Sequence, residues 1–440
     1  MTPEFGLHPG VIFGLAIGLF LGLHLLLRWP LPLTFIAVAV ATALLGDFGV
    51  PFRHLVEGSF GFINLMLALF AGAFFGHMMR CSGAADAAAA GLVRVVGGRV
   101  LPVLALAGLP LFVVGMFVGI AGVAVLSAGV FAVPALRRIG YDDATIAAFV
   151  AVMATAGMIA PPMNVPALLI ADGVNMPWTN VAKPLLALAL PLAAAALIWF
   201  ARCSPNRRRA ALPRLGGGLF AVPLPPGGDG DLAACLRGFA PLALIVAIWV
   251  AVRLSDAVVV DPASPLILVI GGLAALPLLP RKEFRTVIMD AFTGTPLLLA
   301  AVLASVGVLV QVMTLTGVRG WLVIGAMSLE APWNYPGILV GIPLLGGALT
   351  AMAASDVVGV PAAFSFIGQD MILNVAALSA IASLAEFVPP TSISAALSCY
   401  VVGGGTVGQV FRRAWLPLAV LAALAMLMLV FAKQLAGVLT

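Results

Sequence analysis

The sequence predicts an all-α polytopic membrane protein with about 10 to 12 transmembrane helices and two re-entrant hairpins. Hydrophobic residues make up 63% of the 440 residues, and charged residues only 9%. The mean hydropathy is +1.18, whereas soluble domains carry roughly 25% charged residues. Apolar stretches that reach the ~20 residues needed to cross a bilayer recur along the whole chain. A lipid bilayer is therefore the expected surrounding for most of the surface.

The apolar runs, taken in order, predict ten spans. The first has no basic residue ahead of it and no small-residue cleavage site behind it, so we expect it to remain as a helix rather than to be removed as a signal peptide. The ten predicted spans cover residues 8–27, 31–46, 61–79, 145–172, 182–201, 238–253, 264–280, 296–314, 371–403 and 414–432.

Two further apolar segments, residues 100–136 and 335–366, carry glycines near their centres. Each could form two tight spans or one hairpin that leaves the membrane on the side it entered. Hairpins place all six basic clusters on one face, which the positive-inside rule makes cytoplasmic, so both termini are predicted to be periplasmic. The clusters are Arg28; Arg80, Arg94 and Arg99; Arg137 and Arg138; residues 202–214; Arg281, Lys282 and Arg285; and Arg412 and Arg413. Single basic residues outside this pattern are Arg53, Arg253, Arg319 and Lys433.

These patterns divide the chain into five parts. Residues 205–237 are rich in Arg, Pro and Gly and form a predicted cytoplasmic linker. Predicted scaffold helices occupy residues 1–60 and 238–289. Two predicted repeats, residues 61–204 and 290–440, each contain one hairpin (100–136, 335–366) and one broken helix (145–172, 371–403).

The two repeats are related in sequence. Residues 139–162 align without a gap on residues 367–390, 228 positions later, and seven of the 24 residues are identical. Arg137 and Arg138 precede this stretch in the first copy only, whereas Arg412 and Arg413 open the final helix of the second copy. Basic residues at opposite ends indicate repeats of inverted topology, which are typical of secondary transporters whose solute lies where the repeats meet.

Each repeat also carries a Pro-Pro pair inside an apolar span. Proline removes a backbone donor and clashes with the preceding turn, so the helix breaks. Half-helix N-termini at such a break attract anions, and free carbonyls bind cations. Polar residues gather at both breaks, although Ser and Thr also commonly bond back to their own helix. The residues predicted to bind solute or ion are Pro161, Pro162, Thr155, Asn164, Pro389, Pro390, Ser383, Thr391, Ser392 and Ser394.

Two acidic residues are further candidates. Glu386 lies three residues before Pro389 in a neutral run, and a carboxylate within the membrane is costly enough to indicate function. It could bind a cation, take up a proton or contact the solute. Asp356, near the centre of the second hairpin, is a similar candidate. Their counterparts in the first repeat are Met158 and Gly129, so neither acid is shared by the two copies.

Three motifs follow one another in the first repeat: GIAG at residues 119–122, PALRRIGYD at 134–142 and GMIAPP at 157–162. Through them, residues 75–169 resemble the large membrane subunit (M-type, DctM-like) of tripartite ATP-independent periplasmic (TRAP) transporters, within the wider ion-transporter superfamily. The second copy and the run GQVFRRAWLPL in the final helix also fit. The resemblance thus covers about residues 60–204 and 290–432.

This resemblance implies an elevator-type carrier, in which the hairpins and broken helices move the solute against a scaffold. It implies secondary active transport of a small organic acid anion, such as a C4-dicarboxylate, by sodium symport across the bacterial inner membrane. The implied partners are a small membrane (Q-type) subunit and a periplasmic solute-binding protein. No cofactor is expected, apart from Na⁺ as the coupling ion.

The resemblance adds Gly119, Gly122, Gly157 and Thr350 to the candidate site. Thr350 stands nearest to where the family usually has an acidic residue in the second hairpin. At the first hairpin tip the chain has Ala121 and Val123 in place of the family's hydroxyls. This departure argues against side-chain ligation of sodium there and leaves ligation by backbone carbonyls open.

Other functional classes make different predictions. A stand-alone ion-coupled carrier or antiporter of the same superfamily would need no binding protein. A channel would show a continuous polar file, and a membrane scaffold would carry no solute. An enzyme is not expected, because the spans hold no His or Cys cluster, GxSxG motif or paired acids, and solitary His77 is expected to pack. The four cysteines are too far apart to suggest a metal site, and the basic clusters indicate topology rather than nucleic-acid binding.

Overall fold

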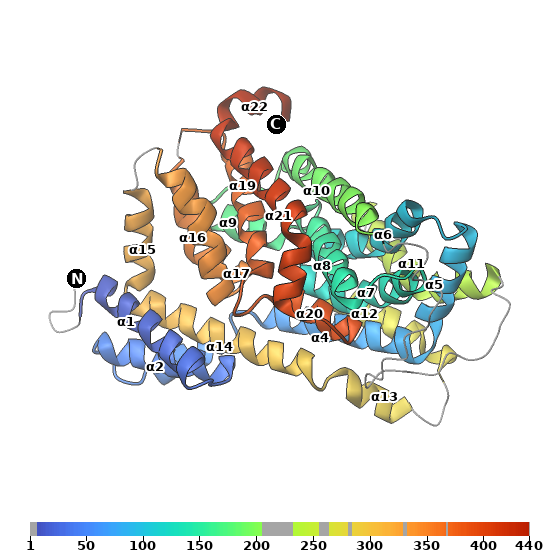
Figure 1. Cartoon of the computed structure of the whole chain (residues 1–440). Coiled ribbons are helices and arrows are strands. Elements are labelled where there is room, and N and C mark those ends of the chain that lie inside the picture. The colour runs from blue at the N-terminus through green and yellow to red at the C-terminus, as the bar shows by residue number, and fades with distance from the viewer. Residues whose placement is uncertain are drawn as a thin grey trace.

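The computed structural model describes residues 7–204, 232–254, 264–279, 284–328, 332–366 and 368–439. Most of the predicted linker, residues 205–231, lies outside the described residues, as do Arg281, Lys282 and Ile367. The described residues form a helical protein (Figure 1). Seven segments among them are long and apolar enough to cross a membrane, which confirms the predicted all-α polytopic membrane protein. They are Pro9–Leu26, Phe52–Cys81, Val100–Val118, Ala121–Arg138, Ala182–Arg202, Thr295–Leu315 and Val407–Val430.

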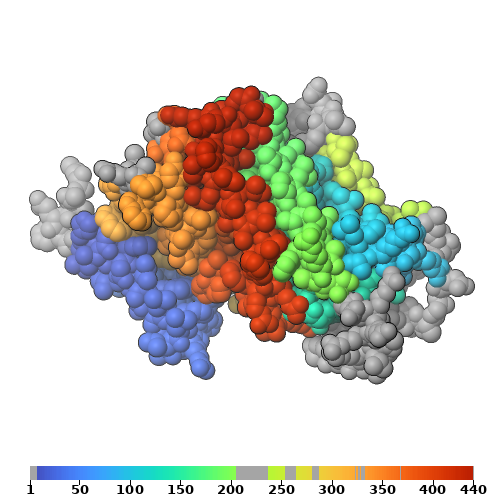
Figure 2. All heavy atoms as spheres, turned by 45° about the horizontal axis from the view of Figure 1, so that its top comes forward, coloured from blue at the N-terminus to red at the C-terminus, as the bar shows by residue number. Residues whose placement is uncertain are grey.

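The N-terminal helices form one flank of the molecule (Figures 1 and 2). They are α1 (Pro9–Leu21), which continues as a π turn (Gly22–Leu26), α2 (Leu31–Leu45) and α3 (Phe52–Ser59). Prolines in the first turns of α1 and α2 suit helix starts, where the missing N–H has no partner to lose. α2 and α3 pack against α14 (Thr295–Leu315), which runs from this flank towards the centre (Figure 1).

Two stretches of chain then show the same order of elements. The first contains α4 (Ile63–Cys81), α5 (Ala84–Val95), α6 (Val100–Val118), α7 (Ala121–Arg138), α8 (Asp143–Ile159), α9 (Val165–Gly173) and α10 (Ala182–Arg202). The second contains α14, α15 (Val318–Met327), α16 (Asn334–Ala348), α17 (Ala351–Ala354), a π turn (Ser355–Gly359), α18 (Val360–Phe364), α19 (Met371–Ser383), a 3-10 turn (Leu384–Phe387), α20 (Ile393–Val402) and α21 (Val407–Val430). α11 (Leu232–Leu254), α12 (Ser264–Ala274), a 3-10 turn (Leu276–Leu278) and α13 (Phe284–Ala291) lie between them, and α22 (Ala432–Leu439) follows.

Two aspartates at equivalent positions of the two stretches have the same structural role. Asp142 caps α8 by accepting the N–H of Thr145 at 3.3 Å. Asp370, 228 positions later, caps α19 by accepting the N–H of Leu373 at 3.0 Å. An aspartate that satisfies an unpaired N–H of the first turn stabilises a helix start by about 1 kcal/mol. The shared aspartate of the sequence repeat is therefore a helix cap in both copies.

Among the described residues, five helices were not among the predicted spans: α3, α5, α13, α15 and α22. Each has 8 to 12 residues, too few to cross a bilayer, so a search for runs of ~20 apolar residues passes over them. The two predicted hairpins appear as α6 with α7 and as α16 with α17 and α18, turning at residues 119–120 and 349–350.

A large buried core joins α4 to α10 with α11, α12 and α19 to α21. α21 lies beside α10, so the last helices of the two stretches are neighbours (Figure 2). A smaller core joins α1 and α2 to α14 and to the turn of the second hairpin. The packing thus places the two broken helices in the large core and brings the second hairpin against the N-terminal flank.

Candidate functional site

The first helix break lies between α8 and α9 and is covered by the tip of the α6–α7 hairpin. Every residue of α8 from Thr145 to Ile159 is buried. The N–H of Met163 donates to the carbonyl of Met116 at 3.2 Å, and the N–H of Val165 donates to the carbonyl of Gly119 at 3.4 Å. Gly119 ends α6 in the left-handed region, with φ +71°, and a Cβ there would lie 2.7 Å from the Met163 carbonyl. Glycine is therefore required at this tip by both conformation and space.

The second break, between the 3-10 turn and α20, is held in the same way by the second hairpin. The N–H of Thr391 donates to the carbonyl of Gly347 at 3.0 Å, and its hydroxyl donates to the same oxygen at 2.9 Å. Thr391 is the positional equivalent of Met163. At both breaks, therefore, the N–H of the residue after the Pro-Pro pair donates to a carbonyl of the hairpin. The peptide bond within each Pro-Pro pair, Pro161-Pro162 and Pro389-Pro390, is cis.

Asn164 connects the first break to the second broken helix. Its side-chain oxygen accepts the N–H of Ala167 at 2.9 Å and so caps α9. Its amide nitrogen donates to the carbonyl of Ile159 at 3.2 Å and to the hydroxyl of Ser379, on α19, at 3.2 Å. Asn164 and Ser379 are both fully buried. Ser379 was not predicted from the sequence. The one feature that could have indicated it is its position one helical turn before the predicted site residue Ser383.

Several predicted site residues make hydrogen bonds within their own helices. The hydroxyl of Thr155 donates to the carbonyl of Ala151 at 2.9 Å, and the equivalent Ser383 donates to Ser379 at 2.8 Å. Both bond back to their own helix, as Ser and Thr often do. Thr350 caps α17 by accepting the N–H of Ala353 at 3.1 Å.

Two predicted glycines are contact points between helices. Gly157 packs on the backbone of Phe112 in α6. A Cβ on Gly122 would meet Leu397 at 3.0 Å and Ile393 at 3.3 Å, so the first hairpin also reaches α20. Gly122 thereby brings the tip of the first hairpin against the second broken helix.

The side chain of Glu386 contacts the first turn of α20, and Ser392 is the residue that precedes this helix. Glu386 is only 4% exposed, and it accepts hydrogen bonds from the N–H of Ser394, at 3.0 Å, and from the Ser394 hydroxyl. Ser392 precedes α20 with φ +38°, and its buried hydroxyl has no hydrogen-bond partner among the described residues. A carboxylate, a hydroxyl and the positive end of a helix therefore meet beside the second break.

Residues 7–202 match the family model of the DctM component of tripartite ATP-independent periplasmic transporters. Over these residues the chain is similar to the DctM component. The match spans the N-terminal helices, the first hairpin and the first break, and the internal repeat relates the second break to them. A search of curated proteins gave no match.

Asp356 has a partner that the sequence did not reveal. Asp356 lies in the π turn of the second hairpin, and Arg319 of α15 pairs with its carboxylate at 2.6 Å and donates to its carbonyl at 3.1 Å. Both side chains are about 30% exposed. The pair ties the second hairpin to α15.

Two arginines of the predicted cytoplasmic clusters also join the two halves of the chain, one through its side chain and one through its backbone carbonyl. Arg137, at the end of α7, pairs with Asp143 at 2.9 Å and donates to the carbonyl of Val402 at the end of α20. The carbonyl of Arg413 in α21 accepts the indole N–H of Trp199 in α10 at 2.8 Å. These contacts attach the ends of the second broken helix and of α21 to the first half of the chain.

Proposed function

We propose that this chain is the large permease subunit of a TRAP transporter. In this proposal it carries a small organic acid anion, such as a C4-dicarboxylate, across the bacterial inner membrane by sodium-coupled secondary active transport. The observation that carries the proposal is the matched pair of hairpin contacts, Met163 to Met116 and Thr391 to Gly347. A solute bound between a hairpin tip and a helix break is released when the tip moves away, so such a contact can serve as a gate.

The second break gives a physical reason for coupling to a cation. A solute carboxylate attracted to the N-terminus of α20 would lie near Glu386. Two unit negative charges about 4 Å apart repel by roughly 4 kcal/mol at an effective dielectric constant of 20. A cation bound at Glu386, with oxygen from Ser392 or from the unwound backbone, removes this repulsion. Binding of the anion is then favoured only when the cation is present.

The proposal includes the arrangement in the membrane. The two stretches are inverted repeats, the hairpins are re-entrant, and the hairpins and broken helices move as an elevator against a scaffold. Both termini are periplasmic. The partners are a small Q-type membrane subunit and a periplasmic solute-binding protein. The DctM family match supports these partners as a class.

Uptake by proteoliposomes tests the proposal. The vesicles hold the chain with its small subunit, and a panel of labelled dicarboxylates and sugar acids is offered with and without the binding protein, under a sodium or a proton gradient. Uptake that needs both the binding protein and a sodium gradient is the expected result. Absence of uptake for the whole panel under every condition would reject transport of these acids.

Glu386 also favours a second candidate, a stand-alone proton-coupled carrier. The first break has Met158 at the equivalent position, so the carboxylate is not part of the shared arrangement. Uptake by the chain alone, driven by protons and abolished in Glu386→Gln, would establish this candidate and reject the tripartite one.

A further inference from the structure

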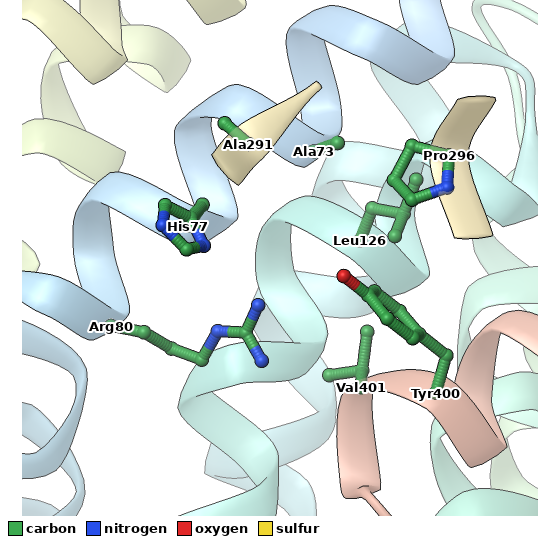
Figure 3. Close-up of a pocket in the computed structure, with 8 residues that line it drawn as sticks. All are labelled: Ala73, His77, Arg80, Leu126, Ala291, Pro296, Tyr400 and Val401. Atoms are coloured by element: carbon green, nitrogen blue, oxygen red, sulfur yellow. The ribbon is translucent and has the colours of Figure 1, made fainter. Parts of the chain in front are cut away.

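A polar pocket lies away from both breaks, where α4, α7 and α20 meet the start of α14. His77 and Arg80 of α4 and Tyr400 of α20 supply its polar groups. Leu126, Pro296 and Val401 supply apolar wall. The space within it, about 10 Å³, holds one water-sized group such as a single carboxylate oxygen, and the pocket is partly open at its mouth. Figure 3 shows the Arg80 guanidinium and the Tyr400 hydroxyl directed into the same space, with the His77 ring beside them.

α20 connects this pocket to the second break. Tyr400 lies eight positions after Ser392, which corresponds to about 12 Å along a helix at 1.5 Å per residue. The far end of α20 is held by Arg137, which donates to the Val402 carbonyl. Arg80 and Arg137 both belong to the clusters predicted to face the cytoplasm. The pocket therefore lies between the second break and the predicted cytoplasmic face.

The electrostatics of α20 explain why a cation is useful at this place. The positive end of the helix dipole is at the break, and the negative end is near Val402. An anion that leaves the break along α20 moves towards the negative end and is repelled. The guanidinium of Arg80 offsets this repulsion and offers five N–H donors in a geometry that fits a carboxylate. Arg80 also interacts within the protein, and a group with five donors can serve both roles.

We propose that Arg80, Tyr400 and His77 form a second binding site for small carboxylate anions, on the exit path from the second break to the cytoplasm. Arg80 binds the carboxylate, the Tyr400 hydroxyl donates to it, and His77 completes the polar wall. The exposed side chain of Asp290, next to the lining residue Ala291, adds negative charge near the site and favours transient rather than tight binding. Only the direction of movement rests on the proposed transport function.

Cys81 provides a reporter that is independent of transport. Its thiol is exposed and lies 3.4 Å from Nε2 of His77. The full chain, with Cys203, Cys235 and Cys399 replaced by Ser, is placed in inside-out vesicles, and labelling of Cys81 by a membrane-impermeant maleimide is timed. Succinate, malonate or sulfate replaces chloride at constant ionic strength. We expect at least one of the carboxylates to slow labelling with saturation.

Variants of the pocket identify the group responsible. Arg80→Gln should raise the anion concentration that gives half-protection by on the order of tenfold, the effect of one lost charge-assisted hydrogen bond. Arg80→Lys should fall between this variant and the wild type. Arg94→Gln removes an exposed positive charge from the nearby helix α5. In this variant the anion concentration that gives half-protection of Cys81 should equal that of the wild type.

The outcomes separate this site from the proposed transport function. No slowing by either carboxylate, or equal protection in Arg80→Gln and wild type, overturns the site. Labelling of Cys81 only from the outer side overturns its place on the cytoplasmic path. Protection by carboxylates in a chain that shows no uptake would reject the transport function and leave the binding site standing.

Discussion

Replacing Gly157 by alanine tests the contact between the first hairpin and the first broken helix. An ideal Cβ on Gly157 would lie 2.4 Å from the carbonyl oxygen of Phe112 and 2.9 Å from two further backbone atoms of that residue. The opposing Gly115 is also too close for a side chain, since its Cβ would be 2.8 Å from the Ala154 carbonyl oxygen. Because these neighbours are backbone, no side chain can turn away, and α6 must move off α8 by about 1 Å to reach ordinary packing distances.

That movement carries the hairpin tip with it. The tip accepts the N–H groups of Met163 and Val165 at 3.2 and 3.4 Å, distances that cannot increase by 1 Å without loss of the bonds. Overpacking costs ~1–3 kcal/mol, and two lost hydrogen bonds cost about 1 kcal/mol each. Alanine regains up to ~1 kcal/mol as a better helix former. The expected net loss of stability is roughly 2–4 kcal/mol.

The assay is thermal unfolding of the purified chain in detergent, followed by the uptake measurement. Gly157→Ala should unfold at a clearly lower temperature and transport poorly. The matched control is Gly14→Ala in α1, where nothing lies within 4 Å of the added Cβ and stability should hold or rise slightly. If both variants unfold and transport like the wild type, the close contact of α6 with α8 is refuted.

Three further predictions concern charged groups. Glu386→Gln keeps the size of the side chain and an acceptor for the Ser394 N–H, so the chain should fold normally while cation-dependent uptake falls by about tenfold or more; unchanged uptake would remove Glu386 from coupling. Asp356→Asn and Arg319→Gln should each lower stability, and a double-mutant cycle should give a coupling of about 1 kcal/mol for this part-exposed pair; additive effects would show that the pair does not hold the second hairpin. Burial raises the pKa of Asp86 on the short helix α5, against the opposing effect of Arg137 and Arg138. The raised pKa means that folding favours the protonated acid, so ionisation above about pH 4 lowers stability. Asp86→Asn should therefore raise the unfolding temperature at pH 7 and have no effect near pH 3, and a gain of the same size at both values would contradict this cause.

Local physical chemistry made much of the architecture readable from the sequence. Hydropathy indicated the long helices, because a lipid-facing helix must be apolar over its whole length. The paired prolines located both breaks, because proline cannot continue a helix. The glycines and the 228-residue offset indicated where the hairpins turn and which elements correspond. None of these inferences requires knowledge of which helices become neighbours.

The partners of individual side chains were decided only by the tertiary structure. Asn164 finds Ser379 across 215 positions, and Arg319 finds Asp356 across 37. The hydroxyls of Thr155 and Ser383, both predicted site residues, bond to carbonyls of their own helices. His77 looked like a packing residue, yet it lines a pocket with Tyr400 of α20. A hydrogen bond or a pocket depends on how helices distant in the chain are placed to within an ångström, and the sequence specifies that placement only through the packing of the whole core.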